Sequence, residues 1–326
     1  MVVPLYVSRE DAKRLIEPSS VLRVIERALA GLSTGLLING TKGGFTLAGQ
    51  DGQRHMGAIS GCDLEANVGG VKWFAACDEN PRRGLPRVPS TIVLCDADTG
   101  ILVGIVDATS LTAARTAALA VCAIRRCVPR RLRKATIVGF GGIGRAITQH
   151  MLEHFEIDEI VVASRNGAAA DVVKATMYPG QSRLSVESRL EHAVRGADLV
   201  VTATGLSKNM PLVDASWLES DVTVCGLGSY QEIDGRVALA ADRIFVDNWE
   251  ACRQRGNLAP IIQSGALARE AIDGEVPDLV AGKLPGRSPN DGTILIALVG
   301  IGALDIALGA ELLRLARSRG VGRALV

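Results

Sequence analysis

The feature that most constrains the fold is a glycine-rich turn at residues 139–144, GFGGIG. It fits the pattern G-x-G-x-x-G, and it lies between an apolar run at 135–138 and a predicted helix that begins at about Ile143. There Gly139 permits a tight turn, Gly141 lets the backbone approach a pyrophosphate, and Gly144 allows close helix–strand packing. The helix N-terminus offers free N–H groups to phosphates. The segment predicts a dinucleotide site; the alternative is a glycine turn without a ligand.

The chain around this turn alternates between apolar runs and helical segments. The runs lie at 135–138, 159–164, 197–204, 221–228 and 242–247. Such alternation predicts an α/β fold, a Rossmann doubly wound parallel sheet over residues 117–300. Residues 1–116 and 301–326 are expected to form a separate α+β substrate domain, with a closing helix at 303–319.

The first domain has a different pattern of predicted helices and strands. Residues 8–34 predict one amphipathic helix, capped by Ser8. The glycine-rich stretch 41–77 predicts short strands, and 90–96 and 101–107 predict two more strands. An alanine-rich helix is expected over 111–127, stopped by Pro129.

The end of the second strand of the Rossmann unit indicates which nicotinamide cofactor binds. NAD enzymes usually carry an acid there, whereas this chain has Ser164 followed by Arg165. A guanidinium suits a 2′-phosphate, so NADP(H) is favoured; NAD(H) is the alternative if Arg165 faces solvent. The expected cofactor-binding set is Gly139, Gly141, Gly142, Ile143, Gly144, Ser164, Arg165, Asn166, Thr202, Ala203, Thr204, Gly226 and Val299.

The composition excludes several classes of function. The formal net charge is +1 at pH 7, which gives no basic surplus for nucleic acid or acidic membranes. The first fifteen residues carry charges where a signal peptide needs an apolar stretch, and the longest apolar run, 294–304, is too short to span a bilayer. Seven cysteines form no C-x-x-C pair, as is typical of a reducing compartment. A cytoplasmic protein without nucleic-acid or membrane partners is expected.

One histidine pair has metal-site spacing. His150 and His154 are four residues apart on a predicted helix. The sequence offers no third ligand nearby and no glutamate beside the first histidine. The pair is therefore interpreted as part of a surface helix, and no metal is predicted.

Two cations stand in apolar surroundings. Lys72 interrupts the run Val71, Trp73 and Phe74, and Arg115 lies among alanines. Burying such charges is costly unless anions pair with them. Each alone could be a surface side chain with a buried stem. Together, ahead of a dinucleotide unit, they predict a clamp for a substrate carboxylate.

These residues stand in motifs that resemble one family. The motifs are G-x-K-W at 70–73, DADTG at 96–100, LTAARTAA at 111–118, the glycine turn, and LVGIGALD at 298–305. The combination is similar to ornithine cyclodeaminases, μ-crystallins and related imine reductases, over about residues 5–325. The resemblance implies a homodimer through the first domain, a small amino-acid substrate and oxidation or reduction at a C–N bond.

The resemblance also implies roles for single residues. Arg115 resembles the arginine that holds the substrate α-carboxylate, and Lys72 the lysine that contacts carboxylate and nicotinamide; both are the predicted catalytic residues. Val299 and Gly300 resemble the pair lining the nicotinamide and substrate pocket.

A narrower likeness is to the amino-carboxyethyl-glutamate dehydrogenases, which make 2,3-diaminopropionate for siderophores and peptide antibiotics. It rests on Asn80 and Arg87 with segments 246–258 and 282–287. Arg54 and Arg87 match basic positions of that branch, and Lys42 is a further candidate, so a substrate with three carboxylates is implied.

One departure separates this chain from cyclodeaminases. They have an aspartate after the strand that ends here at 225–229, whereas this chain has no acid until Glu232. The alternatives that stay open are an ornithine cyclodeaminase, a cyclic-imine or amino-acid dehydrogenase, and a non-catalytic NADP(H)-binding protein of the crystallin type.

Overall fold

The computed structural model describes residues 3–49, 52–165, 167–206 and 208–325. The chain forms two compact units. Unit 1 comprises Met1–Thr116 and Ile301–Val326, and unit 2 comprises Ala117–Gly300. Each is described by itself.

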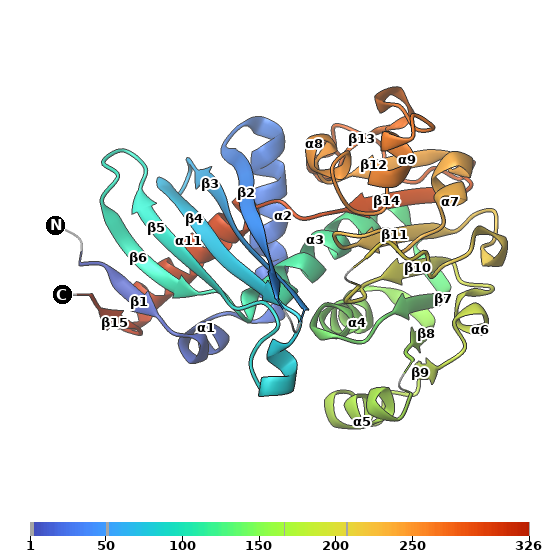
Figure 1. The fold of residues 1–326 in the computed structure, drawn as a ribbon, viewed down its shortest axis with the longest axis horizontal. Helices are drawn as coiled ribbons and strands as arrows, with labels where there is room; N and C mark the ends of the chain where they lie inside the picture. Colours follow the sequence, from blue (N-terminus) through green and yellow to red (C-terminus); the bar gives the residue numbers. More distant parts are fainter. Residues whose placement is uncertain (1–2, 50–51, 166, 207, 326) are drawn as a thin grey trace. The chain divides into compact units, whose positions relative to one another are not determined.

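Unit 2 is built on one eight-stranded sheet with the order β13-β12-β14-β11-β10-β7-β8-β9 (Figure 1). Every strand pair in it is parallel. The sheet grows outward from β7 in both directions, which confirms the doubly wound α/β fold. The strands are β7 Arg131–Val138, β8 Glu156–Ala163, β9 Leu184–Glu187, β10 Leu199–Thr202, β11 Thr223–Leu227, β12 Arg243–Val246, β13 Gly274–Glu275 and β14 Ile294–Leu298.

The central strands of this sheet are apolar because both of their faces are covered. Every residue of β10, β11 and β14 is buried, as expected for a parallel sheet between helical layers. The helices are α4 Gly142–His154, α5 Gly167–Met177, α6 Leu190–Val194, α7 Gly235–Ala240, α8 Trp249–Cys252, α9 Ala259–Gln263 and α10 Val276–Val280.

Unit 1 is a mixed seven-stranded sheet with the order β15-β1-β6-β5-β4-β3-β2. Strand β1 pairs parallel with β6, and the other pairs are antiparallel. The C-terminal helix α11 Ala303–Arg319 packs along β3, β4 and β5 and against α2 (Figure 1). The strands are β1 Leu5–Val7, β2 Leu37–Gly49, β3 Gly52–Asp63, β4 Val68–Cys77, β5 Ser90–Asp96, β6 Leu102–Asp107 and β15 Arg323–Ala324.

The expected single helix over 8–34 is wrong. The segment forms two helices, α1 Arg9–Leu15 and α2 Pro18–Thr34. Ser8 caps α1 as expected, but Pro18 disfavours helical backbone in the residue before it, and the chain is extended at Ile16 and Glu17. The expectation of short strands over 41–77 is also wrong, because β2 and β3 form a long hairpin. Helix α3 Leu111–Cys127 has the expected bounds.

All seven cysteines are free thiols. In the described part of the chain, no helix is both long and apolar enough to cross a membrane.

Candidate functional site

A buried ionic cluster lies within unit 1. Lys72 on β4 places its Nζ 2.7 Å from Oδ2 of Asp305, and the Nε of Arg115 on α3 donates to Oδ1 of the same carboxylate at 3.1 Å. The exposed fractions are 2% for Lys72, 6% for Arg115 and 1% for Asp305. A surface position for either cation is therefore ruled out. We call these three residues the ionic cluster.

Local structure explains how the cluster forms. The sheet register aligns Lys72 with Ile59 and Ile92, so its side chain shares their face of the sheet. Asp305 lies in the first turn of α11, on that side. Gly302 lets the helix start approach β3, because a Cβ there would lie 1.7 Å from Cγ2 of Ile59. The close approach brings the carboxylate to the lysine.

The electrostatics of the cluster favour an anionic ligand. Among the residues that the structure describes, these two cations pair with one carboxylate, so a positive charge is left uncompensated in a buried place. Nη1 of Arg115 is buried without a hydrogen-bond partner among the described residues. Burial lowers the pKa of Lys72 to about 8; Asp305 opposes this shift and Arg115 adds to it. A substrate carboxylate would satisfy the free donor and balance the charge.

Sequence reasoning missed Asp305. It stands in the quoted motif at 298–305 and is flanked by Leu304 and Ile306. An acid in an apolar stretch is the same signal that singled out Lys72. The partner of the two cations is thus in the protein itself, although it compensates only one of them.

The other basic residues predicted to bind substrate differ in their position relative to the ionic cluster. The register runs from Lys72 through Ile59 to Lys42 on β2, so the two lysines share one face of the sheet. The Nζ of Lys42 lies 4.8 Å from the ring centroid of Phe74, which is on that face too. This position supports Lys42 as a candidate to bind a second carboxylate of the substrate.

Arg54 and Arg87 do not join the ionic cluster. Arg54 and Ile59 are five positions apart on β3, which pairs with β4 without a register shift. Because side chains alternate between the two faces of a strand, Arg54 lies on the face opposite to Ile59 and Lys72, where it is exposed. Arg87 is engaged by Asp78 at 2.6 Å. His55 instead lies on the same face as Lys72, and its Nδ1 lies 3.1 Å from the Thr46 hydroxyl. No motif in the sequence selects this histidine.

The glycine turn of unit 2 has the geometry of a phosphate-binding loop. Gly139 adopts φ 101°, which favours glycine, and a Cβ at Gly144 would lie 2.0 Å from the carbonyl oxygen of Gly139. A Cβ at Gly141 would meet nothing within 4 Å, so the space beside it is open. Helix α4 begins at Gly142, next to this open space. The residues present fit a dinucleotide pyrophosphate.

Further expected cofactor residues follow neighbouring parallel strands. Ser164 and Arg165 follow β8, Thr202 ends β10, and Val299 follows β14. They share the carboxyl edge of the sheet with the glycine turn, where ligands of doubly wound folds bind. Arg165 is exposed. Ile143 lies in the first turn of α4, Ala203 and Thr204 follow β10, and Asn166 lies outside the described residues.

Glycine at position 226 is explained by packing. A Cβ there would lie 2.4 Å from Nδ2 of Asn257 and 2.7 Å from Cδ1 of Ile233. Cofactor contact by Gly226 remains a prediction.

Two buried acids lie at the carboxyl edge of the unit 2 sheet, and Glu232 is the first. Glu232 accepts a hydrogen bond from the Thr204 hydroxyl, and its Oε1 lies 3.5 Å from where a Cβ at Gly228 would be. Burial raises the pKa of Glu232. The carboxylate of Glu232 therefore lies near the end of β11. This chain has no acid directly after that strand in the sequence, at the position where an aspartate is expected in cyclodeaminases.

The second acid, Asp247 after β12, organises the other expected pocket residues. Its Oδ2 accepts from the backbone N–H groups of Val299 at 3.0 Å and Gly300 at 2.6 Å. Gly300 has φ 96°, a conformation that glycine adopts without strain. Asp247 thus positions the two residues predicted to line the nicotinamide and substrate pocket.

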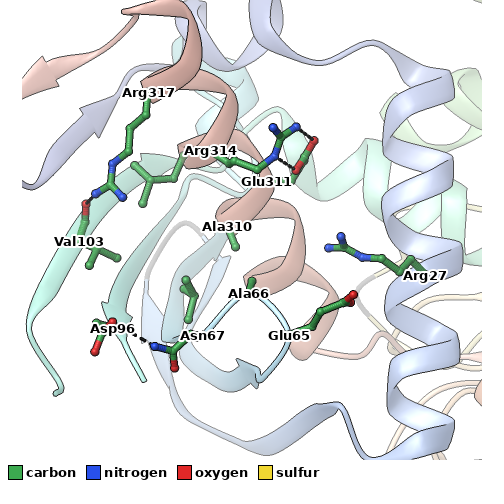
Figure 2. Close-up of a pocket in the computed structure, with 12 residues that line it drawn as sticks. Arg27, Glu65, Ala66, Asn67, Asp96, Val103, Ala310, Glu311, Arg314 and Arg317 are labelled. Carbon is green, nitrogen blue, oxygen red and sulfur yellow. Dashed lines mark hydrogen bonds and ion pairs between the residues drawn. The ribbon is translucent and has the colours of Figure 1, made fainter. Parts of the chain in front are cut away.

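A groove of about 560 Å³ in unit 1 is a different feature. Several of its polar groups are engaged with each other or with backbone: Arg314 with Glu311, Asn67 with Asp96, and Arg317 with the carbonyl of Val103 (Figure 2). Arg27, which also lines the groove, pairs with Asp63 outside it. No member of the ionic cluster lines it, and we assign it no ligand.

The chain belongs to the ornithine cyclodeaminase/μ-crystallin family, whose model matches residues 4–314. One relative is the N-((2S)-2-amino-2-carboxyethyl)-L-glutamate dehydrogenase of Staphylococcus aureus, 26% identical over 80% of this chain and 78% of its own. The Thermococcus litoralis Δ1-pyrroline-2-carboxylate reductase, solved with NADH and L-proline, has a TM-score of 0.91 at 22% identity, over 98% and 100% of the two chains. An archaeal alanine dehydrogenase dimer with bound NAD has a TM-score of 0.90 at 23% identity, over 99% of both. The two structural likenesses show a shared fold.

Proposed function

We propose that the protein is a nicotinamide-dependent oxidoreductase acting on the C–N bond of an amino acid. The observation that carries this proposal is the ionic cluster with its unpartnered Arg115 Nη1, in a chain that also has a dinucleotide-binding loop. Membership of the family and the names of its dehydrogenase and reductase relatives support it. Unit 1 then holds the substrate carboxylate and unit 2 holds the cofactor.

The residues of this chain bind and orient the substrate. Arg115 donates to the carboxylate and fixes its plane, because a guanidinium forms two parallel N–H···O bonds. A bound oxidised nicotinamide would supply the two-electron oxidation of the substrate at Cα. The amine nitrogen must be neutral to form the C=N bond, and Lys72, with a pKa near 8, accepts its proton. Water then adds to the imine and releases a keto acid and an amine; the reverse sequence makes the amine.

The substrate in this proposal is an N-substituted amino acid with more than one carboxylate. Lys42, on the same face as Lys72, supplies a further cation, and the Staphylococcus aureus relative acts on such a compound by its name. The products are then 2,3-diaminopropionate and 2-oxoglutarate. Cyclodeamination of ornithine is the second candidate, since Glu232 supplies an acid beside Gly228. A non-catalytic NADP(H)-binding protein is the third.

NADP(H) is the proposed cofactor, with NAD(H) as the alternative. The support is Ser164 in place of an acid, followed directly by the guanidinium of Arg165. Arg165 is exposed, which is the condition under which the sequence leaves NAD(H) as the alternative. The NAD or NADH named in the two solved structures belongs to those proteins, so the choice needs direct titration.

We also propose a homodimer formed through unit 1, acting in the cytoplasm. One sheet face exposes large apolar side chains, with Phe45 50% and Trp73 45% exposed and their ring centroids 6.5 Å apart. Contiguous exposed apolar surface typically marks an interface. Light scattering after size exclusion should give twice the chain mass at micromolar concentration, and a monomer mass would contradict the dimer.

Absorbance at the nicotinamide band tests the proposed reaction. The purified chain is assayed with NADP⁺ or NAD⁺ and a panel of amino acids, including ornithine and N-carboxyethyl amino acids, and with NADPH or NADH and keto acid–amine pairs. Turnover with a multi-carboxylate N-substituted amino acid supports the proposed substrate. Turnover with ornithine supports the second candidate, and cofactor binding without turnover on any of them supports the third.

A further inference from the structure

Three potential metal ligands gather at the C-terminal end of helix α4. His150, Glu153 and His154 are spaced i, i+3 and i+4, which places them on one face of the helix. One ligand atom from each lies within 4.8 Å of the others. The third potential ligand, which was not selected from the sequence, is therefore Glu153. The expectation that the histidines lie on the surface is wrong for His150, which is 1% exposed.

The two imidazoles have buried nitrogens without partners. Nδ1 of His150 and Nε2 of His154 are shielded from solvent, and neither has a hydrogen-bond partner among the described residues. A buried polar atom without a partner is costly unless something else satisfies it. The rings are nearly parallel, with centroids 5.7 Å apart. A metal ion bound in the plane of each ring, on the lone pairs of these nitrogens, would satisfy both.

The charges around the cluster are compatible with a cation. Glu153 supplies negative charge; its Oε1 accepts from Gln149, and its Oε2 lies 3.7 Å from Nε2 of His154. Arg125 is an opposing charge. The C-terminal end of a helix carries the negative end of its dipole, which favours a cation.

We propose that His150, Glu153 and His154 bind one divalent transition-metal ion of the zinc type. Two histidines and one carboxylate are a known zinc ligand set, and water completes a tetrahedron. With metal–ligand distances of about 2.0–2.2 Å, the three ligand atoms come closer together than 4.8 Å, which side-chain rotations can provide. The ion would link the last turns of α4, the helix that begins within the glycine turn.

Binding of Zn²⁺ to the full-length protein tests this site without any activity assay. Protein stripped with a chelator is titrated with ZnCl₂ by calorimetry, and its thermal unfolding is followed. One saturable site per chain is expected, and its occupation at about a hundredfold excess over Kd should raise Tm by about 5 °C or more. Co²⁺ in place of Zn²⁺ should give the visible absorption of a tetrahedral site.

His154→Ala is the most informative variant, because His154 is less buried than His150. It should weaken Zn²⁺ binding at least tenfold, and Glu153→Gln should weaken it less. His192→Ala on α6 is the matched control, since it removes an exposed histidine elsewhere in unit 2. It should bind Zn²⁺ like the unaltered chain. The proposal is overturned if the unaltered chain shows no saturable Zn²⁺ or Co²⁺ site at millimolar metal, or if folded His154→Ala binds as well as it does.

Discussion

The two units present their binding groups in opposite ways. In unit 2, the proposed cofactor loop is made of consecutive residues, and the groups proposed to bind are backbone N–H groups next to glycines, one of which leaves open space beside it. In unit 1, the ionic cluster is made of charged side chains from β4, α3 and α11, and Arg115 and Asp305 are 190 residues apart in sequence. A backbone site therefore depends on local sequence, whereas a side-chain ionic site depends on the whole unit being folded.

This difference predicts a large stability effect in unit 1. Asp305→Asn leaves two buried cations without an anion, and loss of one partner of a buried pair costs about 3–5 kcal/mol. Urea unfolding should show a loss of that size in the free energy of unfolding. Glu79→Gln is the control, because it breaks an ion pair with Arg82, which is 80% exposed, and should cost at most about 1 kcal/mol. Equal losses for the two variants would show that the cluster adds no special stability.

In unit 2, a side chain at the edge of the cofactor site should change affinity and leave stability alone. Arg165→Ala should weaken NADPH binding about ten- to a hundredfold, or about 1.5–3 kcal/mol, through loss of a charge-assisted contact to the 2′-phosphate. NADH affinity should stay nearly unchanged. Fluorescence titration of both cofactors measures this, and an unaltered chain that binds NADH as tightly as NADPH would contradict the proposed preference.

The smallest expected effect is a pH dependence that originates in unit 1. With its pKa near 8, Lys72 is protonated below that pH, so kcat/KM for substrate oxidation should rise with pH up to about 8 and then level off. Since Asp305 opposes the lowering of this pKa, Asp305→Asn should move the midpoint to lower pH. A midpoint that stays in place would belong to the substrate amine and not to Lys72.

The same contrast explains which parts of the molecule the sequence could predict. The parallel sheet and the glycine turn were predicted because apolar periodicity and glycine spacing are local signals. The break before Pro18 and the long β2–β3 hairpin were not predicted, since amphipathic spacing and frequent glycines hid them. Asp305 was missed as a partner of Lys72 because pairing across the sequence depends on the packing of α11 on β4. Glu153 was missed because it is not adjacent to His150 in sequence, and its approach to the histidines depends on its i+3 position on the helix face.

The central claim is that Arg115 holds the substrate carboxylate, and Arg115→Lys tests it most directly. An ammonium keeps the charge near Asp305 but cannot form the two parallel hydrogen bonds that fix the carboxylate plane. We predict a loss in kcat/KM of about a hundredfold or more, because a displacement of the reacting carbon by about 1 Å can cost that much. Cofactor affinity, measured in the same preparation, should not change. Near-normal kcat/KM in a folded Arg115→Lys protein would contradict the account and make Arg115 a packing residue.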